Sequence, residues 1–228
     1  MARQLAGMDY RKFITALLIA APAAAQDAQN WNTLLLQGPV GGSLLVWAEV
    51  QPRFNSDVGR LGQFLARGGV GVRLANDIDL LAGYHFQHNN PAPGISSDEH
   101  RFWQQVAVPV LRRGNGFALS ARWRLEQRTF EGAGDLGWRL RMQWRVQQPL
   151  RGRGTAGPLA WAETFVAFNS TDWGARSGFD QQRTFVGWLQ PMGRRLNFEA
   201  GYMHQHLNRP GPNPGNHVLN LTLNRRLG

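Results

Sequence analysis

Arginines and carboxylates recur at every second position in several segments of this chain. Residues 122–128 read Arg-Trp-Arg-Leu-Glu-Gln-Arg, and residues 139–145 read Arg-Leu-Arg-Met-Gln-Trp-Arg. Arginine keeps its charge in almost any surroundings, and its planar guanidinium group can bind a carboxylate through two parallel hydrogen bonds. Side chains of this kind gathered on one face can form a network of ion pairs. Where arginine is in excess, the same face attracts anions.

Seventeen charged residues at positions of this kind form the predicted site. Eleven are arginines and six are carboxylates, so the set carries an excess of five positive charges. We keep two hypotheses for it: an ion-pair network that holds the fold together, or a narrow pore or binding site biased toward anions. The set consists of Glu49, Arg53, Arg67, Arg73, Asp79, Glu99, Arg101, Arg122, Arg124, Glu126, Arg128, Arg139, Arg141, Arg145, Glu163, Arg183 and Glu199.

A second group of residues could supply a nucleophile and a base. Residues 96–100 read Ser-Ser-Asp-Glu-His, and His85 and His88 lie in the segment before them. Ser-His-Asp chemistry requires the three side chains to converge in space, and a stretch rich in serine and aspartate is typical of an ordinary turn. The chain has no Gly-x-Ser-x-Gly motif. We therefore assign no catalytic residue and keep a hydrolase or acyltransferase only as an alternative.

Metal and cofactor chemistry has little support in the sequence. His204 and His206 share a face of one segment but have no third ligand at a suitable spacing. The chain contains no cysteine, which excludes disulfide bonds, thiolate metal sites and cysteine nucleophiles. We predict no metal and no cofactor.

The elements that must position the charged residues are β-strands, because apolar and polar residues alternate from residue 44 onward. Ten segments have this period of two. The segment 31–37 would make eleven, an odd number for a single-chain bacterial barrel, so we interpret residues 26–43 as a lead-in or a short extra strand. One further segment would give twelve strands. The ten are 44–54, 63–74, 78–88, 99–110, 117–128, 138–146, 159–169, 181–190, 196–206 and 217–226.

Strand length favours a barrel that spans a membrane. The segments have about ten to thirteen residues, whereas strands of globular proteins have roughly 5–6. At about 3.3 Å per residue and a tilt near 40°, eleven residues rise roughly 28 Å, close to the ~25 Å apolar band of outer-membrane barrels. We predict an all-β fold, a single antiparallel up-and-down transmembrane β-barrel of about ten strands within residues 44–228. Its longer, external loops are expected at 55–62, 89–98, 130–135, 170–180 and 207–216.

The N-terminus has the three parts of an export signal. Arg11 and Lys12 precede an apolar stretch, residues 13–20, and Ala23-Ala-Ala25 provides a small-residue cleavage site. Residues 1–25 are therefore predicted to be a signal peptide that directs export in a Gram-negative bacterium. The remaining 22 arginines and 14 carboxylates are spread singly along the alternating segments. This spread, together with export, argues against nucleic acid as a partner.

Alternation alone does not say which face of the sheet points inward. A soluble barrel would enclose its apolar face around a ligand, whereas a membrane barrel turns that face toward lipid. Two features favour the membrane barrel: opposite charges on the polar face can pair, and nine tryptophans suit the aromatic girdles at the membrane surfaces. Against it, Trp123 and Trp144 fall in the middle of their segments. The expected ion pairs are Glu49 with Arg53, Glu99 with Arg101, and Glu126 with Arg124 and Arg128.

We therefore expect a protein of the outer membrane, in contact with its lipid and with lipopolysaccharide. Loop arginines such as Arg60, Arg176 and Arg209 are candidates for binding lipopolysaccharide phosphates. A small anionic solute is the expected ligand of the lumen. The alternatives are a soluble periplasmic ligand-binding barrel and an outer-membrane enzyme that modifies lipids.

Five short blocks of the polar face carry a family resemblance. They are Trp47-Ala-Glu-Val-Gln-Pro-Arg-Phe54, Glu99-His-Arg-Phe-Trp-Gln-Gln105, Arg122-Trp-Arg-Leu-Glu-Gln-Arg128, Phe179-Asp-Gln-Gln-Arg183 and Glu199-Ala-Gly-Tyr-Met-His-Gln205. In this order they resemble the bacterial family catalogued as domain of unknown function 2490 (DUF2490), over roughly residues 30–226. The resemblance implies an exported barrel-like protein of the outer membrane. The family has no established activity, so it assigns no functional residue.

Overall fold

The computed structural model describes residues 27–209 and 215–228. The predicted signal peptide, residues 1–25, lies outside the described residues. The described chain forms eleven strands and one turn of 3-10 helix, η1 (Ala75–Asp77). Within it, no helix is long and apolar enough to cross a membrane. The strands are β1 (Ala28–Gly41), β2 (Leu44–Asn55), β3 (Arg60–Arg73), β4 (Asp79–Ala92), β5 (Ile95–Arg112), β6 (Ala118–Phe130), β7 (Gly137–Gln147), β8 (Gly157–Ala167), β9 (Gly178–Pro191), β10 (Leu196–Leu207) and β11 (Gly215–Arg226).

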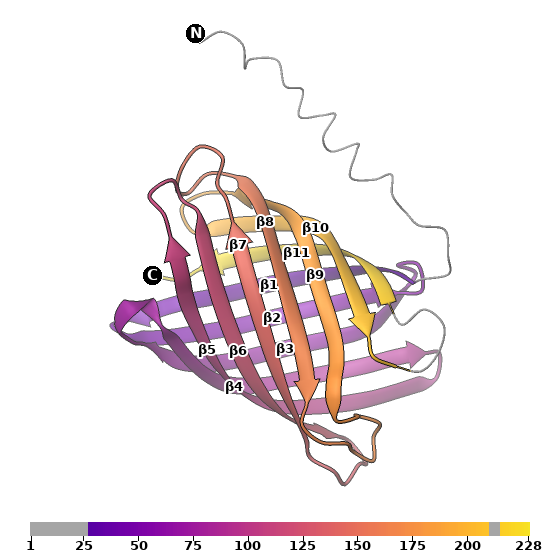
Figure 1. Cartoon of the computed structure of the whole chain (residues 1–228). Helices are drawn as coiled ribbons and strands as arrows, with labels where there is room; N and C mark the ends of the chain where they lie inside the picture. The colour runs from indigo at the N-terminus through magenta and orange to yellow at the C-terminus, as the bar shows by residue number, and fades with distance from the viewer. Residues whose placement is uncertain (1–26, 210–214) are drawn as a thin grey trace.

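The eleven strands form one closed barrel, as Figure 1 shows. Each strand pairs antiparallel with the next along the chain, so the all-β up-and-down barrel expected from the sequence is confirmed. Because the strand number is odd, the first and last strands run in the same direction. The barrel therefore closes through a parallel pair, β1 with β11, in a register that joins Ala28 to His217 and Gln37 to Arg226.

This closure corrects two details of the predicted topology. The segment expected as a lead-in or short extra strand is a full strand of 14 residues, and one strand pair is parallel. The reason lies in the sequence of β1, where Leu34, Leu35 and Leu36 interrupt the alternation that identified the other strands. The observed number of eleven strands lies between the ten and the twelve considered from the sequence.

The connections divide into two groups, one at each end of the barrel. The loop end carries the start of β1 and the connections 56–59, 93–94, 131–136 and 168–177, with residues 208–209 after β10; the turn end carries 42–43, 74–78, 113–117, 148–156, 192–195 and the C-terminus. The loops predicted as external belong to the loop end; of the fifth, 207–216, residues 210–214 lie outside the described residues. The loop predicted at 89–98 is much shorter, because β4 and β5 extend into it and leave only residues 93–94. The β1 start and the C-terminus lie at opposite ends, a consequence of the odd strand number.

The strands place charge inside and apolar side chains outside. Phe102, Val70 and Leu34 are 63%, 61% and 60% exposed on the outer surface, whereas Glu99 and Glu126 are each 1% exposed. A soluble protein of this size rarely exposes so much continuous apolar surface. The distribution is the reverse of that in a water-soluble barrel, in which the apolar face is enclosed.

Aromatic side chains also fill part of the interior, whereas the sequence led us to expect the tryptophans in girdles on the outer surface. Trp31, Trp47 and Trp103 are buried inside, and Trp161 packs against the buried Phe185. Trp103 lies over two glycines of adjacent strands, Gly69 and Gly83, and Phe185 lies in the same way over Gly187 and Gly201. The expected outward position holds for Trp138, Trp144 and Trp188, which are exposed. Tryptophan suits either face because it is apolar yet carries an N–H donor.

The glycines beneath Trp103 generate a stability prediction. A Cβ atom added at Gly83 would collide with the carbonyl oxygen of Gly68 and lie 2.5 Å from the Trp103 ring. We expect Gly83→Ala to destabilise the barrel by roughly 1–3 kcal/mol, the usual cost of overpacking a tight interior. Gly68→Ala is the matched control, because a Cβ atom there meets no atom within 4 Å. Urea unfolding in detergent measures both variants, and equal stability of the two would contradict the packing described here.

Candidate functional site

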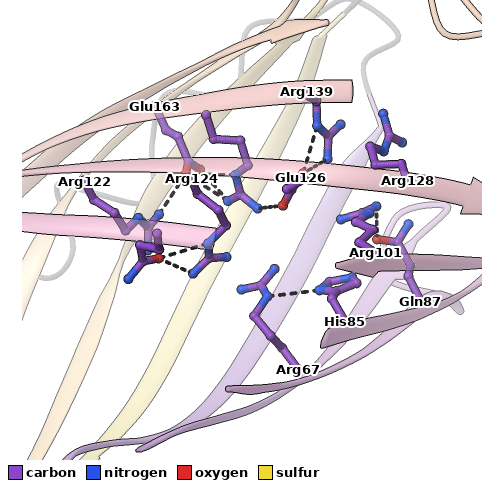
Figure 2. A network of polar contacts seen from close by, with 12 residues as sticks. Arg67, His85, Gln87, Arg101, Arg122, Arg124, Glu126, Arg128, Arg139 and Glu163 are labelled. Atoms are coloured by element: carbon purple, nitrogen blue, oxygen red, sulfur yellow. Dashed lines mark hydrogen bonds and ion pairs between the residues drawn. The ribbon is translucent and has the colours of Figure 1, made fainter. Parts of the chain in front are cut away.

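The first part of the site is a carboxylate on β5 that binds two arginines. Glu99 accepts hydrogen bonds from Arg101 on the same strand, at 2.7 Å, and from Arg128 on β6, at 2.6 Å. Arg101 also donates to the side-chain oxygen of Gln87 on β4, at 2.8 Å. The carboxylate therefore joins β5 to β6, and Arg101 extends the link to β4 through its contact with Gln87, which Figure 2 shows.

Two further glutamates extend the network across β6, β7 and β8. Glu126 binds Arg139 at 2.6 Å and Arg141 at 2.9 Å. Arg141 also reaches Glu163 at 2.9 Å, so it bridges two carboxylates. Arg122 completes the group by binding Glu163 at 2.8 Å across the width of β7. Figure 2 shows these contacts as one continuous set.

We call these eight residues the charge layer. It consists of three glutamates and five arginines: Glu99, Glu126, Glu163, Arg101, Arg122, Arg128, Arg139 and Arg141. The side chains of the three glutamates are between 1% and 3% exposed although they point into the lumen. The five guanidinium groups therefore cover the three carboxylates on the β5–β8 side of the lumen.

The observed ion pairs differ in part from those expected within one segment. Glu99 does bind Arg101, but Glu49 binds Arg67 at 2.8 Å rather than Arg53. Glu126 binds Arg139 and Arg141 of β7, and neither Arg124 nor Arg128, the two expected partners, is bound to it. Residues i and i+2 on one strand are about 6.6 Å apart along it, whereas directly opposed residues of paired strands lie about 4.5–5.5 Å apart. Cross-strand partners are therefore closer, and the sequence alone did not identify them.

The remaining predicted charges also face the lumen. Arg145 on β7 binds Glu199 on β10 at 2.7 Å, and Arg73 binds Asp79 near the turn end at 2.7 Å. The site also includes residues that the sequence analysis missed: Asp180, which binds Arg139 at 3.0 Å, and the fully buried His85, which accepts a hydrogen bond from Arg67. His85 could have been included from its position, because it lies an even number of residues from Asp79 on the same strand.

Three buried arginines have no carboxylate within ion-pair distance among the described residues: Arg53, Arg124 and Arg183. Each is held by a glutamine and by aromatic rings. Arg124 donates twice to Gln105, at 2.9 and 2.6 Å, and its guanidinium carbon lies 4.7 Å from the centre of the Trp103 ring. Cation–π contact of this kind contributes roughly 0.5–2 kcal/mol, more where water is excluded.

A cavity of about 860 Å³ occupies the lumen; it begins at the turn end and extends inward to Trp31, Arg53 and Arg183. Its lining contains thirteen arginines and five carboxylates, so it carries a large excess of positive charge. Arg122, Arg141 and Glu163 of the charge layer form part of its inner wall, and Arg112, Arg194 and Arg195 lie around its mouth. An electropositive, concave site of this size can attract and hold an anion with several non-hydrogen atoms.

The serine and histidine residues considered for catalysis do not assemble into a triad. His88 and Asp98 lie together, with 2.6 Å between His88 Nδ1 and Asp98 Oδ1, and His100 hydrogen-bonds to Tyr84 instead. Among the described residues, neither Ser96 nor Ser97 shares a side-chain hydrogen bond with a histidine. The same part of the chain contains no group of three His, Cys, Asp or Glu residues that could hold a metal ion.

Comparison with known proteins gives one family and two similar proteins. A family model described as "Protein of unknown function (DUF2490)" matches residues 28–216. An uncharacterized protein of Methylorubrum extorquens is 35% identical over 187 residues, which are 82% of this chain and 81% of the relative. A solved structure, the outer-membrane expressed OmpT of Vibrio cholerae, aligns with a TM-score of 0.40 and 12% identity over 72% of this chain. The aligned part is 54% of that structure, so the chain spans about half of its length.

The charge layer generates a second stability prediction. We expect Glu99→Gln to destabilise the barrel by roughly 3–5 kcal/mol, because it leaves both Arg101 and Arg128 buried without a carboxylate. Asp77→Asn is the matched control, since its ion pair with Arg112 is about half exposed and should contribute only about 0–1 kcal/mol. Urea unfolding in detergent compares the two variants. A loss for Glu99→Gln no larger than that for Asp77→Asn would contradict the role of the charge layer.

Proposed function

The chain belongs to the DUF2490 family of proteins of unknown function, and from this premise we propose that it is an outer-membrane β-barrel that takes anionic solutes into a cavity lined with arginine. The observation that carries the proposal is the inside-out distribution of its side chains: apolar outside, charged and ion-paired inside. The signal peptide expected at residues 1–25 would supply the route of export.

The outer surface supports a position in a lipid bilayer. On β2 the outward positions from Leu44 to Phe54 are all apolar, and on β7 so are those from Trp138 to Val146. Eleven consecutive strand residues, such as 44–54, rise roughly 28 Å at an ordinary tilt, which is close to the thickness of the apolar band of outer-membrane barrels. A soluble ligand-binding barrel would have to expose this entire band to water, which opposes that alternative.

The lumen supports an anionic rather than a cationic solute. The cavity lining holds more than twice as many arginines as carboxylates, and the nearby walls of the barrel have a lower dielectric constant than water. Charges of one sign at the walls of such a recess concentrate counter-ions inside it. The cavity opens at the turn end, so the solute would enter from that side.

A narrow anion-biased channel is the second candidate function. The observation that favours it is the excess of arginine along the lumen, which would select anions in any path that crossed the barrel. Such a path requires the charge layer to open, because its carboxylates are buried in the arrangement described here. The two candidates therefore differ in whether solute stops at the charge layer or passes through it.

Substitution on the outer surface tests the membrane position. Leu34 lies midway along β1 and is 60% exposed, so Leu34→Arg would be harmless in a soluble barrel. In a bilayer we expect this variant to be destabilised by roughly 2–4 kcal/mol relative to the unchanged chain. Folding into liposomes, read from gel mobility before and after boiling, measures the effect. Leu150→Arg is the control, because Leu150 is equally exposed but lies in the connection 148–156; equal yields for the two variants would contradict the proposal.

Planar-bilayer recording separates the cavity from the channel. We expect the unchanged protein to give no steady current, because the proposal places the end of the solute's path at the buried charge layer. Replacing Glu99, Arg101 and Arg128 together by Ala removes part of the charge layer without leaving an unpaired charge, and should produce an anion-selective current. A steady current from the unchanged protein would favour the channel instead. A cation-selective current from either protein would contradict the proposed anion preference.

A further inference from the structure

We propose that Arg53 and Arg183, which lie against Trp31 on the cavity floor, bind the acidic group of an organic anion that has an apolar body. The inference rests on the proposed function in one respect, namely that solute reaches the cavity. It adds to that function a defined site and a chemical class of ligand.

Arg183 is the main donor of this site. Its side chain points into the lumen from β9 and is only 9% exposed, yet it lines the cavity. Its Nε atom donates to Gln181 at 3.2 Å, whereas its two Nη atoms have no hydrogen-bond partner in the described part of the chain. The four N–H bonds of these two Nη atoms are therefore available to acceptors of an anion in the cavity.

Arg53 is the second donor. It is also 9% exposed, and it donates through Nε to Gln51 at 2.7 Å and through Nη1 to Gln63 at 2.9 Å. Its Nη2 atom has no partner among the described residues. Glutamine is neutral, so these contacts orient the guanidinium group without cancelling its charge. That charge remains for an anion in the cavity.

Aromatic rings hold both guanidinium groups by their faces. The Arg53 guanidinium carbon lies 3.6 Å from the centre of a Trp31 ring, and that of Arg183 lies 4.9 Å from it. Arg183 also lies 4.6 Å from the Phe165 ring, which Arg141 approaches to the same distance. Stacking on a ring occupies the flat face of a guanidinium group and leaves its N–H edge available. The arrangement therefore places two guanidinium groups beside Trp31 at the cavity floor. The distance between their central carbons cannot exceed the sum of their distances to the Trp31 ring.

The walls above this floor are apolar on two sides. One side is a buried cluster that contains Leu45, Leu81 and Trp47, and the other includes Trp161 and Met203. An inorganic anion would use the arginines but leave these surfaces unoccupied. A carboxylate or phosphate monoester with an aromatic or aliphatic body fits both the charge and the volume of about 860 Å³. This chemistry defines the class of ligand.

Isothermal titration calorimetry of the full-length barrel in a non-ionic detergent tests the site. The probes are 1-naphthoate and 1-naphthyl phosphate, with 1-naphthalenemethanol as the neutral analogue and inorganic phosphate as the analogue without an apolar body. We expect one of the two naphthyl anions to bind at least tenfold more tightly than either analogue, since a charge-assisted hydrogen bond contributes roughly 1.5–3 kcal/mol. Whichever anion binds more tightly identifies the acidic group.

Matched variants distinguish the site from the general positive field. Arg183→Gln should weaken the binding of the better naphthyl anion by about tenfold or more, and Arg183→Lys should weaken it less because the charge is kept. Arg194→Gln removes the same charge at the cavity mouth and should change the affinity little. Should Arg183→Gln fail to fold, as judged by gel mobility before boiling, Arg53→Gln serves as the second test of the same site.

Three results would overturn the inference. They are equal binding of the neutral and anionic naphthalenes, unchanged affinity in Arg183→Gln, or an equal loss in Arg194→Gln. These failures are distinguishable from failure of the proposed function, because binding in detergent needs neither a bilayer nor a current. A barrel that inserts into liposomes but binds no naphthyl anion would keep the membrane assignment and lose this site.

Discussion

Pairing of buried guanidinium groups with carboxylates is the interaction on which the rest of the molecule depends. A closed sheet whose outer surface is apolar must place its polar side chains in the lumen, and eleven strands enclose too little space to surround each of them with water. Three glutamates answer this constraint by binding five arginines from three strands. The same contacts tie β5, β6, β7 and β8 together on one side of the lumen.

The interior is asymmetric along the barrel axis. Toward the loop end three glutamates and five arginines are joined in ion pairs, whereas thirteen arginines and five side-chain carboxylates line the cavity. Trp103 and Phe185 lie over glycines of adjacent strands and so take up lumen volume at mid-height. A barrel built in this way has one accessible recess rather than a uniform pore. The proposed uptake of anionic solutes follows from that asymmetry.

The odd number of strands determines where the two ends of the barrel's sheet lie. An up-and-down barrel with an even number of strands has both chain ends on one side, but here the start of β1 and the end of β11 are on opposite sides. The parallel pairing that results is as regular as the antiparallel ones and extends over ten residue pairs. It leaves the sheet without a free edge, and open sheet edges do not occur in the hydrocarbon region of a bilayer. The odd strand number thus costs the barrel none of its backbone pairing.

The sequence by itself determined the period of the strands, and hence which charged residues share a face. Arg122, Arg124, Glu126 and Arg128 must point to one side of β6 because side chains alternate along a strand. We inferred that this side points inward because opposite charges on it can pair with one another inside a lumen. Alternation also assigned ten of the strands, and it failed at β1, where three consecutive leucines hide the period.

The tertiary structure decided everything that depends on register and closure. Arg145 and Glu199 are 54 residues apart in sequence, and Arg122 reaches Glu163 past an intervening strand, so no local pattern could pair them. Trp103 lies inside over two glycines of adjacent strands, Gly69 and Gly83, an arrangement that the indole ring itself does not reveal. Likewise, that Arg53 and Arg183 lie against one tryptophan depends on bringing β1, β2 and β9 around the same lumen. Alternation fixes the side to which a residue points; only the closed sheet fixes its height and its neighbours.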